Sequence, residues 1–197
     1  GELRFEVTDR TTGRRVAARS VPCRLEPGSE TVMNETLQLG GDVKLWNEFT
    51  PNLYEVTVAF EGGGNSAERS EVFGMRSIAA DGNRLLVNGT PAFMRGTLEC
   101  CIFPLTGYPP TDPEGWEKVF RTAKEWGLNH LRFHSWCPPE AAFEVADRVG
   151  MYLQVELPVW TLNVGADSLA TAFMYEEGER MLAAYGNHPS FCFMSMG

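Results

Sequence analysis

The sequence predicts an all-β region followed by an α/β region, and three observations support this fold class. In the first part of the chain, short apolar runs separated by turn residues dominate, and residues 54–60 alternate apolar and mostly polar side chains as a half-buried strand does. Beyond residue 76, strand-like runs alternate with amphipathic helical patterns. A length of 197 residues with 43% hydrophobic residues suits one or two globular domains.

The N-terminal region contains short strand candidates and no helical pattern. The candidates are residues 3–7, 16–21, 31–39, 54–60 and 68–73. Several short strands with regular turn signals predict a β-sandwich. The loop that precedes residue 54 contains Trp46, which we expect to be a buried aromatic anchor that serves packing rather than binding.

The second region begins with a hairpin signal, because Asn88-Gly89 lies between two apolar runs. Asp112 and Pro113 then open a helix as N-cap and first helical residue, and Gly127 ends it. Further helices are predicted from the Pro138-Pro139-Glu140 stretch to Gly150 and from about residue 168 to about 185. Strands are predicted at residues 93–99, 130–134, 152–157 and 191–196. Strands joined by helices imply a parallel sheet, as half of an eight-stranded barrel or as a small doubly wound sheet.

Composition narrows the classes of partner. A net charge of −9 argues against a nucleic acid or an anionic membrane as partner, and no apolar run reaches the length of a membrane span. The five cysteines include no Cys-x-x-Cys pair, so neither a disulfide framework nor a zinc site is indicated. No metal and no cofactor are expected, and the sequence does not predict an oligomeric state.

Motifs in the second region carry a resemblance to a known family. Phe73-Gly74-Met75-Arg76 is similar to a Phe-Gly-Phe-Arg linker, and similar matches follow in the same order at residues 86–96, 127–132, 147–156, 187–190 and 196–197. In this order and spacing, they resemble glycoside hydrolase family 2, the β-galactosidase and β-glucuronidase type, over nearly the whole chain. The resemblance implies an immunoglobulin-like β-sandwich over residues 1–76 and the first half of a (β/α)₈ TIM barrel over residues 77–197.

The resemblance also implies a function. The family's retaining glycosidases hydrolyse O-glycosidic bonds of β-linked sugars with two glutamates, whose carboxyl groups lie about 5–5.5 Å apart. In the family, the acid/base glutamate follows the fourth strand in a Gly-Asn-Glu motif, and the nucleophile lies further on. This sequence stops at Gly197, the glycine of that motif, so both catalytic glutamates are expected beyond it. We therefore expect the chain to be a truncated fragment that is inactive by itself.

What remains in the chain is part of the substrate pocket, because barrel enzymes place their sites at the carboxyl ends of strands. That rule selects Glu99, Arg132, His134, Trp136, Glu156 and Trp160 as substrate-binding candidates. By resemblance, Arg132 is the arginine that orients the nucleophilic carboxylate, a task that suits an always-charged fork. Glu156 resembles the acid that forms a polar wall of the site.

The other candidates have less specific roles. Trp136 and Trp160 are candidates to offer an apolar face to a sugar ring, and His134 to donate to a hydroxyl. Two departures from the family pattern mean that the sequence does not identify the sugar. His134 follows Arg132 by two residues, where the family has three, and Glu99 stands near the position at which many family members have a histidine.

Most of these candidate residues also have a purely structural interpretation. Arg132 and Glu156 can form a buried ion pair between adjacent strands, while His134, Trp136 and Trp160 can be core or rim packing. His188, before Pro189 in a turn, is interpreted as structural. The chain can also be part of a non-catalytic carbohydrate-binding or scaffolding protein with a degenerate barrel, or of an unrelated barrel hydrolase. Similar proteins are commonly exported by glycan-degrading bacteria, which favours a periplasmic or extracellular location, although no export signal is in view.

Overall fold

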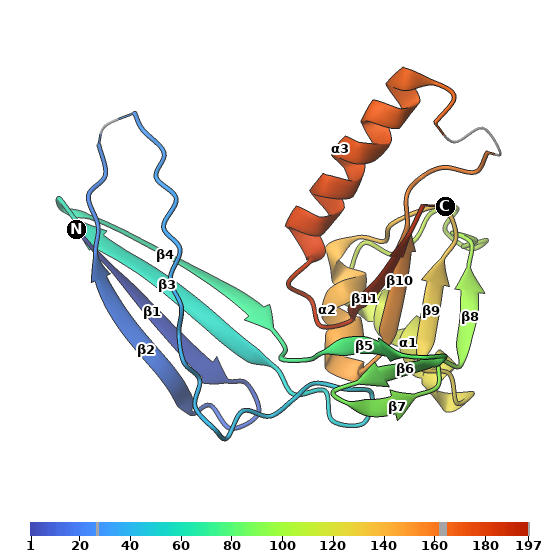
Figure 1. The fold of residues 1–197 in the computed structure, drawn as a ribbon, viewed down its shortest axis with the longest axis horizontal. Helices are drawn as coiled ribbons and strands as arrows, with labels where there is room; N and C mark the ends of the chain where they lie inside the picture. The colour runs from blue at the N-terminus through green and yellow to red at the C-terminus, as the bar shows by residue number, and fades with distance from the viewer. Residues whose placement is uncertain (27, 162–164, 197) are drawn as a thin grey trace. The chain divides into compact units, whose positions relative to one another are not determined.

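The computed structural model describes residues 1–26, 28–161 and 165–196, which form two compact units (Figure 1). The first unit is made of Gly1–Lys44 and Asn52–Met75, and the second of Leu45–Pro51 and Arg76–Gly197. Gly197, after which the catalytic glutamates are expected, lies outside the described residues. The predicted boundary after residue 76 stays a prediction, and the contacts assign the short loop Leu45–Pro51 to the second unit.

The first unit is built on one four-stranded antiparallel sheet in the order β2-β1-β3-β4. Its strands are β1 (Glu2–Asp9), β2 (Arg15–Pro22), β3 (Tyr54–Gly62) and β4 (Asn65–Phe73). Val7 lies opposite Val56 in the register, and the buried ring of Tyr54 stacks on Phe73 with centroids 5.8 Å apart. The apolar positions of the alternating pattern therefore share one face of the sheet.

A partly buried ion pair, between Lys44 and Asp9, stabilises one end of this sheet. The Lys44 ammonium donates to Oδ2 of Asp9 at 2.9 Å, and Thr11 and Thr12 donate their backbone N–H groups to Oδ1 of the same carboxylate. The hydrogen bond from Lys44 is the main reason that the pKa of Asp9 falls to about 2, although burial opposes it. The ionised form of Asp9 is thus the one that the fold requires.

The predicted strand over residues 31–39 is wrong, since this segment pairs with no strand. Burial does alternate along it, because Met33, Glu35, Leu37 and Leu39 are half-buried and the residues between them are exposed. Arg19 holds the segment by donating to the carbonyl of Thr36 at 3.2 Å. Apolar alternation reports which face is buried but cannot show whether the backbone finds a ladder partner. The structure confirms an antiparallel β region, and the two-layered sandwich stays a prediction.

The second unit begins with a three-stranded antiparallel sheet of β5 (Ile78–Asp81), β6 (Arg84–Val87) and β7 (Thr90–Ala92). The predicted hairpin turn joins β6 to β7, with φ of 54° at Asn88 and 76° at Gly89. Positive φ at both central residues is what the tight Asn-Gly hairpin turn needs. The hairpin prediction is confirmed.

A four-stranded parallel sheet in the order β11-β10-β9-β8 follows. It contains β8 (Gly96–Glu99), β9 (His130–Phe133), β10 (Tyr152–Glu156) and β11 (Phe191–Ser195), connected by α1 (Pro113–Glu125), α2 (Glu140–Val149) and α3 (Ser168–Tyr185). The N-cap is as predicted, since Asp112 accepts the N–H of Gly115 at 2.9 Å. The α/β prediction is confirmed, and closure of such a sheet into a barrel stays a prediction.

The core of the second unit lies between α1, α2 and one face of this sheet (Figure 1). Leu131 and Phe133 on β9 meet Trp116 and Phe120 on α1, and Phe143 on α2 joins them. In contrast, α3 buries only Met181 and exposes several large apolar side chains among its described residues. No helix in the described part of the chain is long and apolar enough to cross a bilayer.

Trp46 confirms its predicted role as a packing anchor. Its side chain is fully buried, and its Nε1 donates to the carbonyl of Asp147 on α2 at 2.8 Å. Its ring meets Tyr152 on β10 edge to face, with centroids 5.6 Å apart. Glu48, two residues later, accepts from the side chains of Asn129 at 2.8 Å and Arg95 at 2.9 Å. Loop 45–51 is therefore anchored in the second unit through Trp46 and Glu48.

Candidate functional site

Four residues meet at the carboxyl ends of β9, β10 and β11, and we call them the Glu156 cluster: Arg132, Ser135, Glu156 and Ser195. Nε of Arg132 donates to Oε1 of Glu156, and Oγ of Ser195 donates to the same oxygen at 2.8 Å. The backbone N–H of Ser135 donates to Oε2 at 2.8 Å. Parallel strands bring their carboxyl ends to one edge, which explains how residues far apart in sequence converge here.

The electrostatics of the cluster favour an ionised carboxylate. Burial by itself raises the pKa of Glu156, whose side chain has no exposed area. The hydrogen bonds from Arg132, the Ser135 N–H and the Ser195 hydroxyl outweigh this effect and bring the pKa below its usual value. Conversely, the hydrogen bond to Glu156 raises the pKa of Arg132. The expected ion pair between adjacent strands is present, and it is buried on the glutamate side.

Ser135 occupies an unusual backbone conformation. Its φ is 59°, in the left-handed region that residues with a side chain rarely adopt. The turn after β9 thereby aims the Ser135 N–H at Glu156, while its Oγ is buried and without a partner among the described residues. Such strained positions persist only where surrounding contacts hold them. Neither Ser135 nor Ser195 is among the residues predicted from the sequence, although both satisfy the strand-end rule.

Glu99 lies apart from the Glu156 cluster. In the register of β8 and β9 it pairs with Phe133, whereas Arg132 pairs with Leu98, so alternation places Glu99 on the opposite face. Its carboxylate accepts the N–H of Cys101 at 3.0 Å within its own turn. Burial is the main cause that raises the pKa of Glu99. The strand-end rule selects the edge of the sheet correctly but does not select the face.

The two predicted tryptophans differ. Trp136 is half-buried and packs against the core, with ring centroids 5.3 Å from Phe133 and 6.3 Å from Trp116. Trp160 is 86% exposed, and the centroid of the His134 ring lies 6.4 Å from it. The structure therefore brings His134 and Trp160 together at the surface, whereas Trp136 lies beneath the surface against the core. The buried His188 pairs with Asp147 at 2.6 Å just before β11, in keeping with a structural role.

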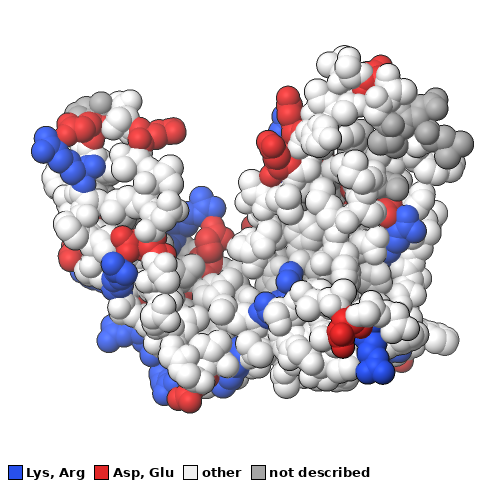
Figure 2. Space-filling model, viewed as in Figure 1, with Lys and Arg blue, Asp and Glu red and all other residues white. Residues whose placement is uncertain are grey.

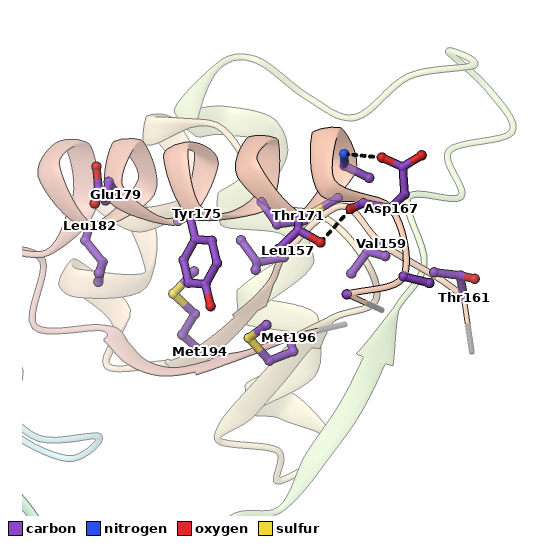
Figure 3. A pocket seen from close by; sticks show the side chains of 15 residues that line it. Leu157, Val159, Thr161, Asp167, Thr171, Tyr175, Glu179, Leu182, Met194 and Met196 are labelled. Atoms are coloured by element: carbon purple, nitrogen blue, oxygen red, sulfur yellow. Dashed lines mark hydrogen bonds between the residues drawn. The ribbon is translucent and has the colours of Figure 1, made fainter. Parts of the chain in front are cut away.

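A groove of about 640 Å³ lies between α3 and the ends of β10 and β11 (Figure 3). Figure 3 shows Tyr175 pointing from α3 toward Met194 and Met196, and Leu157 also lines the groove. This volume is in the range of small-molecule sites, but the lining is largely apolar. On the face of the second unit drawn in Figure 2, charged side chains form small separate groups with wide uncharged areas between them.

Comparisons with known proteins agree with this architecture. The family model described as glycosyl hydrolases family 2 matches residues 2–76. A β-galactosidase of Lactococcus lactis is 27% identical over 162 residues, which cover 78% of this chain and 16% of that protein. A β-galactosidase of Thermoanaerobacterium thermosulfurigenes is 27% identical over 152 residues, or 76% of this chain and 20% of that protein.

The solved structures show the same fold. β-Glucuronidase 2 of Bacteroides uniformis superposes with a TM-score of 0.84 at 22% identity, over 100% of this chain and 24% of that one. The β-glucuronidase of Parabacteroides merdae gives a TM-score of 0.80 at 20% identity, again over 100% of this chain and 24% of that one.

The resemblance to glycoside hydrolase family 2 is confirmed by the family model over residues 2–76, by the curated relatives and by the solved structures. The chain spans between 15% and 20% of the length of the curated relatives it matches.

Proposed function

We propose that this chain is part of a retaining glycoside hydrolase that cleaves O-glycosidic bonds of β-linked sugars, and that it forms one side of the sugar site. The observation that carries the proposal is the Arg132–Glu156 pair at the carboxyl ends of β9 and β10, in a chain related to β-galactosidases. An arginine fixed at this edge of a parallel sheet is suited to hold a carboxylate or a sugar oxygen.

The proposal includes the architecture. Residues 1–76 are proposed as an immunoglobulin-like β-sandwich domain and residues 77–197 as the first half of a (β/α)₈ barrel. Loop 45–51 belongs to the first range in sequence but packs with the second unit. The four parallel strands connected by helices support this architecture, and so does the superposition on β-glucuronidases over the whole chain. The acid/base and nucleophile glutamates are proposed to lie in sequence beyond Gly197, because the mechanism needs both.

Within this chain, the six predicted residues receive different roles. Arg132, His134 and Trp160 are proposed to face the carbohydrate, since Trp160 is exposed beside the His134 ring and Arg132 is half-exposed. Glu156 is proposed to act through Arg132. Glu99 and Trp136 are proposed to shape the wall behind these groups, because the Trp136 Nε1 donates to the carbonyl of Glu99 at 3.4 Å.

The test compares the 197-residue chain with the gene product in its natural length on a panel of chromogenic β-glycosides that includes galactosides and glucuronides. We expect hydrolysis only by the longer protein. Activity of the 197-residue chain would contradict the position assigned to the catalytic glutamates. Carbohydrate binding without hydrolysis in either protein would favour the non-catalytic carbohydrate-binding alternative.

A pair of matched variants tests the site itself. Trp160→Ala in the longer protein is expected to lower kcat/KM about 3- to 10-fold, the effect of losing one aromatic contact. Trp126→Ala is the control, because Trp126 is also highly exposed, at 82%, but follows α1 at the amino-terminal edge of the sheet. Equal effects of the two substitutions would exclude Trp160 as a sugar platform.

A further inference from the structure

Glu156 cannot touch a substrate in this structure. Its side chain is fully buried, and both of its carboxylate oxygens accept hydrogen bonds. The donors come from the end of β9, from the turn that follows β9 and from the end of β11. The three donors are the Arg132 guanidinium, the Ser195 hydroxyl and the Ser135 N–H. A group in this position acts through its partners, and here its charged partner is Arg132.

Among the described residues, Arg132 is held on one side only, by the hydrogen bond from its Nε to Glu156. Its side chain is 40% exposed, in contrast to that of Glu156. A guanidinium has five N–H donors in a rigid fork, so the Nη groups keep their capacity to bind a further acceptor. The direction of this fork depends on where the Glu156 carboxylate is held.

We propose that Ser195 and Ser135 are positioning residues that lock the Glu156 carboxylate onto Nε of Arg132, and so aim the Nη groups of Arg132 at the reacting site. This inference rests on the proposed glycosidase function and adds two residues to it. Ser195 contributes its hydroxyl, which ties the end of β11 to β10. Ser135 contributes its backbone N–H, which the left-handed turn directs at Oε2.

The contribution of Ser195 is tested with an isosteric pair in the gene product of natural length. Thr keeps the hydroxyl and Val removes it, while both have nearly the same shape and suit a strand. We expect Ser195→Val to lower kcat/KM about tenfold, as loss of a hydrogen bond to a charged group does, mainly through kcat. Ser195→Thr is expected to retain most of the activity.

The pH profile separates positioning from general damage. The Ser195 hydroxyl is one of the donors that lower the pKa of Glu156, so Ser195→Val raises that pKa. The acid limb of the profile is then expected to move to higher pH. Among the described residues, the titratable groups that face the cluster are Arg132 and, near Arg132, the thiol of Cys100. The Arg132 guanidinium stays charged throughout the acid range. Ser195→Val and Ser195→Thr keep every titratable group of the protein, so a difference between their acid limbs is assigned to the hydrogen bond from the Ser195 hydroxyl to Glu156.

Ser190→Ala is the matched control. Ser190 is a fully buried serine at the other end of β11, whose hydroxyl donates to the carbonyl of Phe143 at 3.5 Å. We expect this variant to lose stability without a change in the pH profile. For the turn, Ser135→Gly keeps the N–H and suits the positive φ, so the acid limb of its pH profile is expected to stay where it is in the unsubstituted protein. A shift of that limb in Ser135→Gly would overturn the role given to the backbone N–H.

A second readout does not need activity. A carboxylate with a lowered pKa in the folded state contributes stability above its unfolded pKa, and this stability is lost as the pH falls through the folded pKa. Thermal unfolding of Ser195→Val should therefore become acid-sensitive at higher pH than that of Ser195→Thr. Identical unfolding and activity profiles for Thr and Val overturn the inference. Absence of hydrolysis by the unsubstituted protein refutes the proposed function instead, and the unfolding comparison still decides the inference.

Discussion

Replacement of Trp46 by alanine tests whether loop 45–51 is a structural part of the second unit. Trp46 is fully buried against Tyr152, and its Nε1 donates to the Asp147 carbonyl. Truncation of a buried Trp to Ala typically costs about 3–5 kcal/mol. The Asp147 carbonyl loses its partner as well, which adds about 1 kcal/mol. We expect a loss of about 4–6 kcal/mol in the free energy of unfolding, a large part of a typical domain's stability.

The measurement is native-state hydrogen exchange at the amides of α2, which reports opening of the second unit separately from the first. Trp46→Phe separates the two contributions, because it keeps most of the apolar contact and removes only the N–H donor. It is expected to cost about 1–2 kcal/mol. The order of effects should be alanine, then phenylalanine, then the unsubstituted protein.

Phe49→Ala is the control for this experiment. Phe49 belongs to the same loop, but its side chain is 81% exposed. Substitutions at exposed positions usually change stability by less than about 0.5 kcal/mol. The reasoning fails if Trp46→Ala lowers the protection of α2 no more than Phe49→Ala does. In that case loop 45–51 would be a loosely attached connection rather than a segment anchored in the second unit by Trp46.

Three further predictions concern glycines, an acid group and thiols. Gly150→Ala should destabilise the second unit by about 1–3 kcal/mol, because φ at Gly150 is 73° and an added Cβ would lie 2.8 Å from a backbone carbonyl oxygen. Gly178→Ala should stabilise α3 by up to about 1 kcal/mol, because an added Cβ there would meet its nearest atoms at 3.5 and 3.6 Å. Urea unfolding that ranks the two variants in the reverse order would contradict this. Since the pKa of Asp9 is lowered from 3.8 to about 2, its contribution to stability should be lost as the pH falls over that interval, and Asp9→Asn should remove this acid dependence in pH-dependent unfolding of the first unit. Burial raises the pKa of Cys192 to about 12, so iodoacetamide at pH 8 should label the exposed Cys100 first, and mass spectrometry showing equal rates would refute the difference.

Much of the fold is determined locally and could be predicted. The Asn88-Gly89 turn, the Asp112 cap and the Gly150 stop each depend on the conformational preference of one or two residues, and all three occur where expected. The strand predicted over residues 31–39 does not form, and local patterns could not show this. A strand exists only when its backbone finds a partner, and that partner is distant in sequence.

The candidate site shows the same division more sharply. The sequence by itself determined that Arg132 and Glu156 stand at the ends of neighbouring strands, because strand period and length are local properties. Only the tertiary structure decided that Glu99 lies on the other face, that Trp136 packs against the core, and that Ser135 and Ser195 complete the cluster. The register of a strand and the face on which each side chain lies depend on pairing between segments more than twenty residues apart. The energy of that pairing depends on both segments together, so neither segment alone predicts it.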